Sequence, residues 1–161
     1  MNKNQSPYML EAASDYLRAA KLLWNEPNLG GVAVVNAGIA MEIILKSFIA
    51  EPVENNRRNT VGEQYEIKGK KLHLLTELAK KIDPELYRKL GFNRHELWLE
   101  KFNNLFVESR YPYEEQSRKG YSEAAIYIGI EMFKETIKWY KETGNEDPWV
   151  QEYPNVAGGG L

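Results

Sequence analysis

An arginine and two tyrosines stand close together near residue 110, and these residue types can recognise a phosphate and a base. Arg110 can donate a planar pair of hydrogen bonds to a phosphate, and the rings of Tyr111 and Tyr113 can stack on nucleobases. In the structural alternative, Tyr111 lies in the core and Arg110 pairs with a carboxylate. Arginine and tyrosine are also common anchors of protein interfaces. We therefore take Arg110, Tyr111 and Tyr113 as candidate ligand-binding residues.

Histidine moves protons near neutral pH, and the chain contains two histidines. His73 lies on the polar side of a predicted helix, one turn from Glu77, where it could act as a proton shuttle or contact an anion. In the structural alternative it hydrogen-bonds to a loop at the start of that helix. We favour the second interpretation, because one histidine without an Asp, Ser or Cys partner specifies no reaction.

Glu42 and Lys46 are the obvious charged pair in an otherwise apolar segment, and they are one helical turn apart. They could form a polar spot in a groove, which makes Lys46 a candidate ligand contact. The structural interpretation is that the pair marks the exposed edge of a buried helix. Such a pair contributes roughly a few tenths of a kcal/mol.

Composition excludes several classes of site. The chain has no cysteine, which removes disulfides, thiolate nucleophiles and Cys-based metal sites. It has no Gly-rich phosphate loop, His-Glu-x-x-His motif or nucleophile elbow, so we expect no metal and no cofactor. A net charge of −2, from 21 basic and 23 acidic residues, argues against non-specific adhesion to nucleic acid or membrane.

The location expected from the sequence is cytoplasmic, without a membrane partner. The opening residues, MNKNQSPYML, lack the basic start and apolar run of a signal peptide. The most apolar stretch, residues 31–50, carries Asn36, Glu42 and Lys46, and we interpret it as a core helix rather than a membrane span.

The elements that must position these residues are helices. Apolar residues at spacings of three and four predict long helices over about 7–24, 31–50, 93–108 and 122–144. A helix over about 71–82 ends at Asp83-Pro84, a capping signal that opens a short helix ending at Gly91. Asn93 and Glu96 are predicted to cap the helix that follows. The predicted fold is an all-α, up-and-down bundle of four long helices plus one short helix.

The chain is long enough for one domain, which we place at residues 1–144, with a C-terminal tail over 145–161. Within the domain, residues 51–71 are predicted to form an irregular loop insertion, with a hairpin around 61–67 as an alternative. The tail is predicted to be extended, with Trp149 and Tyr153 able to hold part of it against the surface.

Four segments in order carry a resemblance to a known family. Residues 10–23 (LEAASDYLRAAKLL) form an opening helix of small and apolar residues, and residues 40–46 (AMEIILK) are similar to an Ala-Glu-x-x-x-Leu-Lys pattern. Residues 70–82 (KKLHLLTELAKKI) are similar to a His-x-Leu-x-x-Leu helix, and residues 109–114 (SRYPYE) to a Ser/Ala-Arg-Tyr-Pro turn. Together they resemble the HEPN (higher eukaryotes and prokaryotes nucleotide-binding) domain over about 10–141.

The resemblance implies a helical bundle, often homodimeric, used in toxin–antitoxin systems, in defence modules and beside nucleotidyltransferases. Active members of the family are metal-independent RNases that use an Arg followed, after four to six residues, by a His at a dimer cleft. Those residue types suit that chemistry, because Arg binds a phosphate and His moves a proton.

The chain departs from that RNase pattern. Asn103 and Asn104 stand where an Arg-Asn pair is expected, and Glu108 falls near the expected His. Arg88 and His95 match the spacing formally, but a helix break around Gly91 separates them and so short a match arises easily by chance. The RNase dyad is therefore predicted to be absent.

The leading hypothesis is a HEPN-like binding and dimerisation module that holds a nucleotide, an RNA segment or a partner protein. The alternatives are a metal-independent endoribonuclease with a non-standard site and a helper subunit of a nucleotidyltransferase. The candidate ligand-binding residues are Arg110, Tyr111, Tyr113, His73, Asn104, Glu108 and Lys46.

Overall fold

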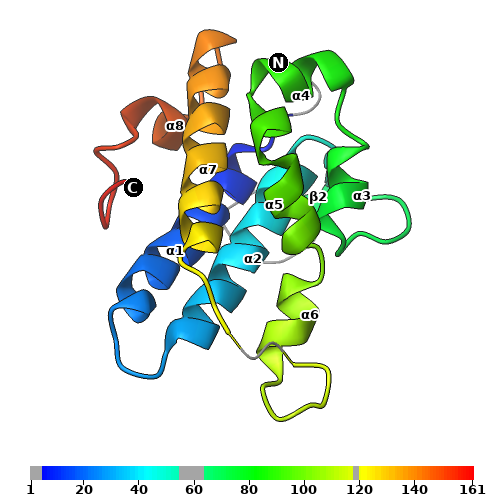
Figure 1. The fold of residues 1–161 in the computed structure, drawn as a ribbon. Coiled ribbons are helices and arrows are strands. Elements are labelled where there is room, and N and C mark those ends of the chain that lie inside the picture. The colour runs from blue at the N-terminus through cyan, green and yellow to red at the C-terminus, as the bar shows by residue number, and fades with distance from the viewer. Residues whose placement is uncertain (1–4, 55–63, 118–119) are drawn as a thin grey trace.

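The protein is described by a computed structural model that covers residues 5–54, 64–117 and 120–161. Three long helices dominate these residues: α1 (Pro7–Trp24), α2 (Gly30–Ser47) and α7 (Ala124–Glu142). The shorter elements are α3 (Leu75–Ala79), α4 (Pro84–Lys89), η1 (Phe92–His95), α5 (Glu96–Lys101), α6 (Leu105–Arg110) and α8 (Pro148–Glu152). The prediction of an all-α protein is confirmed, whereas the described part has three long helices instead of four (Figure 1).

Helices α1 and α2 form an antiparallel pair at the centre of the fold (Figure 1). Pro7 opens α1 at its first position, where the missing N–H costs no hydrogen bond. The inward face of α1 has the spacing of three and four predicted from the sequence, and it is completely buried at Leu10, Ala13, Leu17 and Ala20. A connection of only a few residues, closed by hydrogen bonds around Glu26, returns the chain along α1.

Helix α2 is the core helix, as predicted. It packs against α1, α6 and α7. Small residues let these neighbours approach closely, since a Cβ added to Gly38 would lie 3.3 Å from Leu105 Cδ2 on α6. Its length and a mean hydropathy of 1.4 would suffice to cross a membrane, but half of the residues are buried inside the bundle. The apolar character of α2 is therefore explained by its central position.

The ends of α1, α2 and α7 are joined by buried hydrogen bonds. Tyr140 of α7 is completely buried, and its hydroxyl accepts the backbone N–H of Ser6 at 2.7 Å. Ser6 Oγ donates to the carbonyl of Ser47, at the end of α2, at 3.2 Å. Burial raises the pKa of Tyr140 to about 12, so this hydroxyl stays protonated in neutral solution. The Tyr140 hydroxyl therefore satisfies a polar group that would otherwise be buried without a partner.

We expect Tyr140→Phe to lower the free energy of unfolding by about 1–2 kcal/mol, because the buried N–H of Ser6 loses its acceptor while the ring keeps its packing. Urea denaturation followed by circular dichroism measures the change. Tyr127→Phe is the matched control, since that side chain lies on the same helix and is 59% exposed. A Tyr140→Phe protein as stable as the control would contradict the assigned hydrogen bond.

The helix predicted over 93–108 is wrong as a continuous element, because the chain forms η1, α5 and α6 instead. Gly91, at a φ of +72°, precedes η1, so Asn93 lies inside η1 and caps no helix. The second break, between α5 and α6, coincides with a contact to a distant part of the chain. The side-chain oxygen of Asn103, between α5 and α6, accepts the backbone N–H of Thr76 at 3.0 Å and its hydroxyl at 3.1 Å. Asn103 thus satisfies a free N–H in the first turn of α3.

Helix α3 is shorter at both ends than the helix predicted over about 71–82, and it ends at Ala79. Helix α3 begins at Leu75 rather than near Lys71, whose φ of +56° is left-handed and breaks a helix. Helix α4 matches its prediction, since Pro84 opens it and Asp83 Oδ1 accepts the N–H groups of Glu85 at 3.1 Å and Leu86 at 2.9 Å. These capping bonds fix the start of α4.

The prediction of an irregular segment over 51–71 is wrong for the residues that form two short strands. Strand β1 (Glu51–Val53) pairs antiparallel with β2 (Gln64–Glu66), and Pro52 lies opposite Tyr65. Residues 55–63 lie outside the described residues, so residues 61–63 of the alternative hairpin around 61–67 fall there, whereas residues 64–66 form β2. These two strands form the only sheet in the described chain.

The tail after Gly144 is not extended throughout, because residues 148–152 form α8. Asp147 caps this helix by accepting the N–H of Val150 at 3.1 Å. The rings of Trp149 and Tyr153 lie 6.3 and 5.4 Å from that of Phe133 on α7, and Val150 is completely buried. Burial of these apolar side chains holds the segment in place, as predicted for Trp149 and Tyr153.

Candidate functional site

The residues first singled out in the sequence lie at the C-terminal end of α6. The guanidinium carbon of Arg110 lies 4.9 Å from the ring centre of Phe106 and 4.7 Å from that of Tyr111. The Tyr113 ring lies a further 5.8 Å from the Tyr111 ring, at a tilt of 42°. We call Phe106, Arg110, Tyr111 and Tyr113 the α6 aromatic cluster.

Local sequence explains this arrangement. Phe106 and Arg110 are four residues apart in α6, so their side chains lie on the same helical face. Pro112 disfavours helical geometry at Tyr111, and the helix ends there with a φ of −125° and a ψ of 81°. The turn that follows is closed by a hydrogen bond of 3.0 Å from Ser117 Oγ to the carbonyl of Pro112. The helix end and the turn together place the Tyr111 ring against Arg110.

The structural alternative for Arg110 and Tyr111 does not describe this site. Tyr111 is 37% exposed instead of lying in the core, and Tyr113 is 82% exposed. Arg110 is also exposed, and its guanidinium contacts two rings. Phe106, which the sequence analysis did not select as a site residue, could have been found from its spacing of four residues from Arg110. A cation and three aromatic rings are thus gathered at the surface.

Lys46 and His73 belong to a second group, centred on Glu42. Glu42 Oε1 is hydrogen-bonded to Lys46 Nζ within α2, and it lies 3.0 Å from Nδ1 of His73. The side chains of Glu42 and Lys46 are only 13% and 15% exposed, so the interpretation of an exposed helix edge is wrong. His73 remains 68% exposed. A nearly buried carboxylate therefore orients an exposed imidazole ring.

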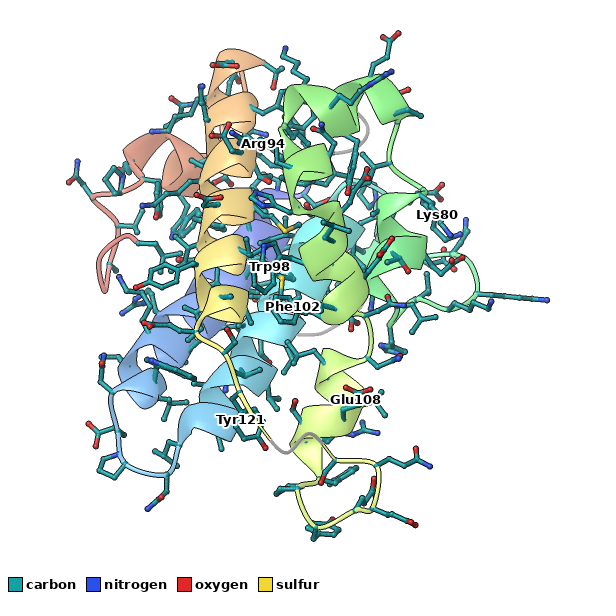
Figure 2. The ribbon with its side chains drawn as sticks, in the orientation of Figure 1. Lys80, Arg94, Trp98, Phe102, Glu108 and Tyr121 are labelled. Carbon is teal, nitrogen blue, oxygen red and sulfur yellow. The ribbon has the colours of Figure 1, made fainter. Side chains whose placement is uncertain are left out.

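The remaining two sequence candidates lie on or beside α6. Asn104 is exposed at the position before the first residue of α6, and its backbone carbonyl accepts the N–H of Glu108 at 2.9 Å. Glu108 is half-buried on the same helix (Figure 2). The six residues of α6 span roughly 9 Å. Asn104 and Arg110 therefore lie at opposite ends of one short helix.

The formal Arg-His match does not form a joint site. His95 is buried, and its Nε2 lies 3.3 Å from Glu131 Oε2 on α7. Burial lowers the pKa of His95, Glu131 opposes that shift, and Arg94 adds to it. Arg88 instead lines a pocket on α4 and donates Nε to the carbonyl of Pro84 at 3.3 Å. The sequence-based rejection of this pair agrees with these contacts.

The pocket beside Arg88 was not predicted. It encloses about 600 Å³ between α3, α4, η1 and α5, and it is lined by Thr76, Ala79, Lys80, Ile82, Pro84, Tyr87, Arg88, Asn93, Glu96, Leu99 and Glu100. The lining residues come mainly from four elements that become neighbours only on folding, so no short sequence motif predicts the pocket. Its base is apolar and its rim carries charges of both signs.

The geometry of these groups is the basis for any functional conclusion. In the described residues, no three His, Asp or Glu side chains are placed to hold a metal ion together. No family model matches the chain, and no curated protein or solved structure matches it either.

Proposed function

We propose that the chain is a HEPN-like binding module that holds single-stranded RNA on the α6 aromatic cluster. The order of the family-like segments and the all-α fold support the first part of the proposal. The chemistry of the cluster supports the second part, because a cation beside exposed rings suits a phosphate next to a base. Binding without cleavage is the activity proposed, since the RNase dyad is missing from the sequence.

The observation that carries the proposal is the contact of the exposed Arg110 guanidinium with two rings, those of Phe106 at 4.9 Å and Tyr111 at 4.7 Å. Both rings attract the cation electrostatically and hold the guanidinium at the surface. Its N–H donors lie in the plane of the group, and a phosphate can accept two of them side by side. Because the rings already restrict the side chain, less conformational entropy is lost when RNA binds.

The exposed tyrosine rings provide the complementary contact to the bases. Tyr113 is 82% exposed, and its ring lies 5.8 Å from the Tyr111 ring. Stacking of one base on an aromatic ring contributes about 1–3 kcal/mol and tolerates any base. We therefore expect binding with little sequence preference. Because one arginine contacts phosphate, we also expect the logarithm of the binding constant to fall with the logarithm of the salt concentration with a slope of about −0.7.

Arg110→Ala is expected to weaken binding of a fluorescent oligouridine at least about tenfold, equivalent to roughly 1.4 kcal/mol. Arg110→Lys is expected to weaken it too, because an ammonium lacks the planar pair of donors. Tyr113→Ala removes a stacking surface and is expected to cost a similar amount. Fluorescence anisotropy with the purified full chain measures all three dissociation constants.

Arg94→Ala is the matched control, because Arg94 is exposed and lies far from α6, toward the opposite end of the molecule (Figure 2). Circular dichroism establishes that each variant is folded. If the Arg110→Ala and Arg94→Ala proteins bind RNA equally well, the α6 aromatic cluster is not the RNA site.

A second candidate function, metal-independent RNA cleavage, is favoured by the contact between Glu42 and His73. A carboxylate on Nδ1 orients an imidazole so that its other nitrogen faces solvent, which suits a general base. Incubation of the full chain with RNA in EDTA separates the two functions. Intact RNA supports the binding module, whereas cleavage that is lost in His73→Gln would establish the enzyme instead.

A further inference from the structure

The pocket between α3, α4, η1 and α5 has the form of a ligand site and does not belong to the α6 aromatic cluster. Helices α4 and α6 lie toward opposite ends of the molecule (Figure 1). The volume of about 600 Å³ is within the range of small-molecule sites. Ile82 and Leu99 form part of its apolar base and are 3% and 1% exposed. The base can therefore accept an apolar group of modest size.

The phenol of Tyr87 has an unmet hydrogen-bonding capacity in this pocket. The side chain is 9% exposed, and its ring packs edge-on against Phe92 at 5.8 Å. Within the described chain no group hydrogen-bonds to its hydroxyl, which is nonetheless not sealed from solvent. Because Tyr87 lines the pocket and its hydroxyl has no partner in the described chain, the hydroxyl is available to a group bound there. Burial and the nearby Glu96 carboxylate raise the pKa of Tyr87 to about 12.

Two carboxylates accompany this phenol. Glu96 and Glu100 are one turn apart on α5, and both line the pocket. In the described part of the chain neither forms a hydrogen bond or an ion pair with a cationic side chain. Two like charges at this spacing repel each other, so a cation placed between them would be stabilised by both.

The basic residues of the rim do not neutralise the carboxylates of Glu96 and Glu100 by ion pairing. Lys80 Nζ pairs with Glu77 at 2.9 Å, outside the set of lining residues. Arg88 comes from α4, and in the described chain it forms no ion pair with Glu96 or Glu100. A monocation bound beside α5 is therefore attracted by two carboxylates and repelled by the one guanidinium on α4.

We propose that this pocket binds a small organic amine in its ammonium form, with the ammonium between Glu96 and Glu100 and its apolar body over Ile82 and Leu99. The Tyr87 hydroxyl accepts one N–H of the ammonium, which meets its unused capacity. Arg88 opposes the cation and excludes ligands with a second positive charge. The proposal does not depend on RNA binding at α6.

The test uses two probes with the same apolar body and opposite charge, phenethylamine and 3-phenylpropionate, titrated into the full chain by calorimetry. Phenethylamine is expected to bind with a dissociation constant on the order of 1 mM, as suits a small ligand at an open site. The carboxylate probe is expected not to bind. Equal binding of the two probes, or no binding of the amine at about ten times that concentration, would overturn the proposal.

Neutralising a charge is expected to change the affinity for phenethylamine in opposite directions on the two sides of the pocket. Glu96→Gln and Glu100→Gln are each expected to weaken phenethylamine binding about tenfold, whereas Arg88→Gln strengthens it severalfold. Tyr87→Phe removes the acceptor, keeps the ring, and weakens binding. Glu146→Gln, an exposed change of the same charge in the turn before α8, is the control and leaves binding unchanged. Weakening by Arg88→Gln would contradict the assigned position of the ammonium.

RNA affinity measured on the same variants separates this proposal from the proposed function. The Glu96→Gln and Glu100→Gln proteins are expected to bind the oligouridine like the unmodified chain, and Arg110→Ala is expected to bind phenethylamine normally. Loss of both activities in any of these variants would indicate unfolding, which circular dichroism detects.

Discussion

Replacing Phe48 with alanine is expected to lower the free energy of unfolding by about 3–5 kcal/mol. The Phe48 ring, next to the last residue of α2, is 1% exposed and lies between elements from distant parts of the chain. It contacts Phe92 of η1 edge-on at 5.9 Å and Trp139 of α7 at 5.6 Å. Truncation loses the burial of the ring and leaves a cavity that these rigid neighbours cannot fill. Urea denaturation followed by tryptophan fluorescence measures the loss.

The same substitution is expected to abolish phenethylamine binding, because the ring contacts continue from Phe48 through Phe92 to Tyr87 in the pocket wall. At roughly 2–4 °C per kcal/mol for a chain of this size, the midpoint of thermal unfolding falls by about 6–20 °C. Tyr127→Ala, at a 59% exposed position, is expected to change stability by no more than about 0.5 kcal/mol. Comparable losses in the two variants would show that Phe48 is not a core residue.

Local patterns in the sequence were sufficient to predict the long helices. The spacing of Leu10, Ala13 and Leu17 indicates one buried face, and Pro7 marks where α1 begins. Asp83-Pro84 likewise predicts α4, because both capping interactions involve residues within three positions. These elements are encoded by neighbouring residues, so a pattern within one segment reveals them.

The predictions failed where a distant contact decides the local structure. The break between α5 and α6 depends on the bonds from Thr76 to Asn103, which are 27 positions apart. The tail is helical in part because Trp149 and Tyr153 find Phe133 on α7. Strand β1 pairs with β2, in which Glu51 lies opposite Glu66, a residue far along the chain. None of these partners can be identified from periodicity alone.

The same distinction applies to the candidate sites. Arg110, Tyr111 and Tyr113 were selected correctly as neighbours because they are close in sequence. The contact of His73 with Glu42, 31 positions away, was not predicted, so the histidine seemed to have no carboxylate partner outside its own helix. The pocket between α3, α4, η1 and α5 is the extreme case, because four elements contribute to its lining. Sites built across elements require the fold before their chemistry can be recognised.

The crossing of α7 over α1 and α2 provides the other large expected effect. A Cβ placed on Gly129 of α7 would lie 2.8 Å from Leu17 Cδ2 and 3.5 Å from Met41 Cγ. Gly129→Leu adds four carbons in this contact, and we expect a loss of roughly 3 kcal/mol in the free energy of unfolding. Gly120→Ala is the control, since nothing lies within 4 Å of its added Cβ, and it is expected to leave stability nearly unchanged.

A compensating substitution determines whether the loss at Gly129 comes from overpacking against Leu17. Leu17→Ala alone creates a cavity and is expected to cost about 2–5 kcal/mol, because Leu17 is completely buried. In the double variant, the new leucine at position 129 occupies the space that Leu17 leaves. The two losses should therefore sum to more than the loss of the double variant, with a coupling of about 1–3 kcal/mol by urea denaturation. Strict additivity would mean that the residues do not touch, and the packing of α1 against α7 would have to be reassigned.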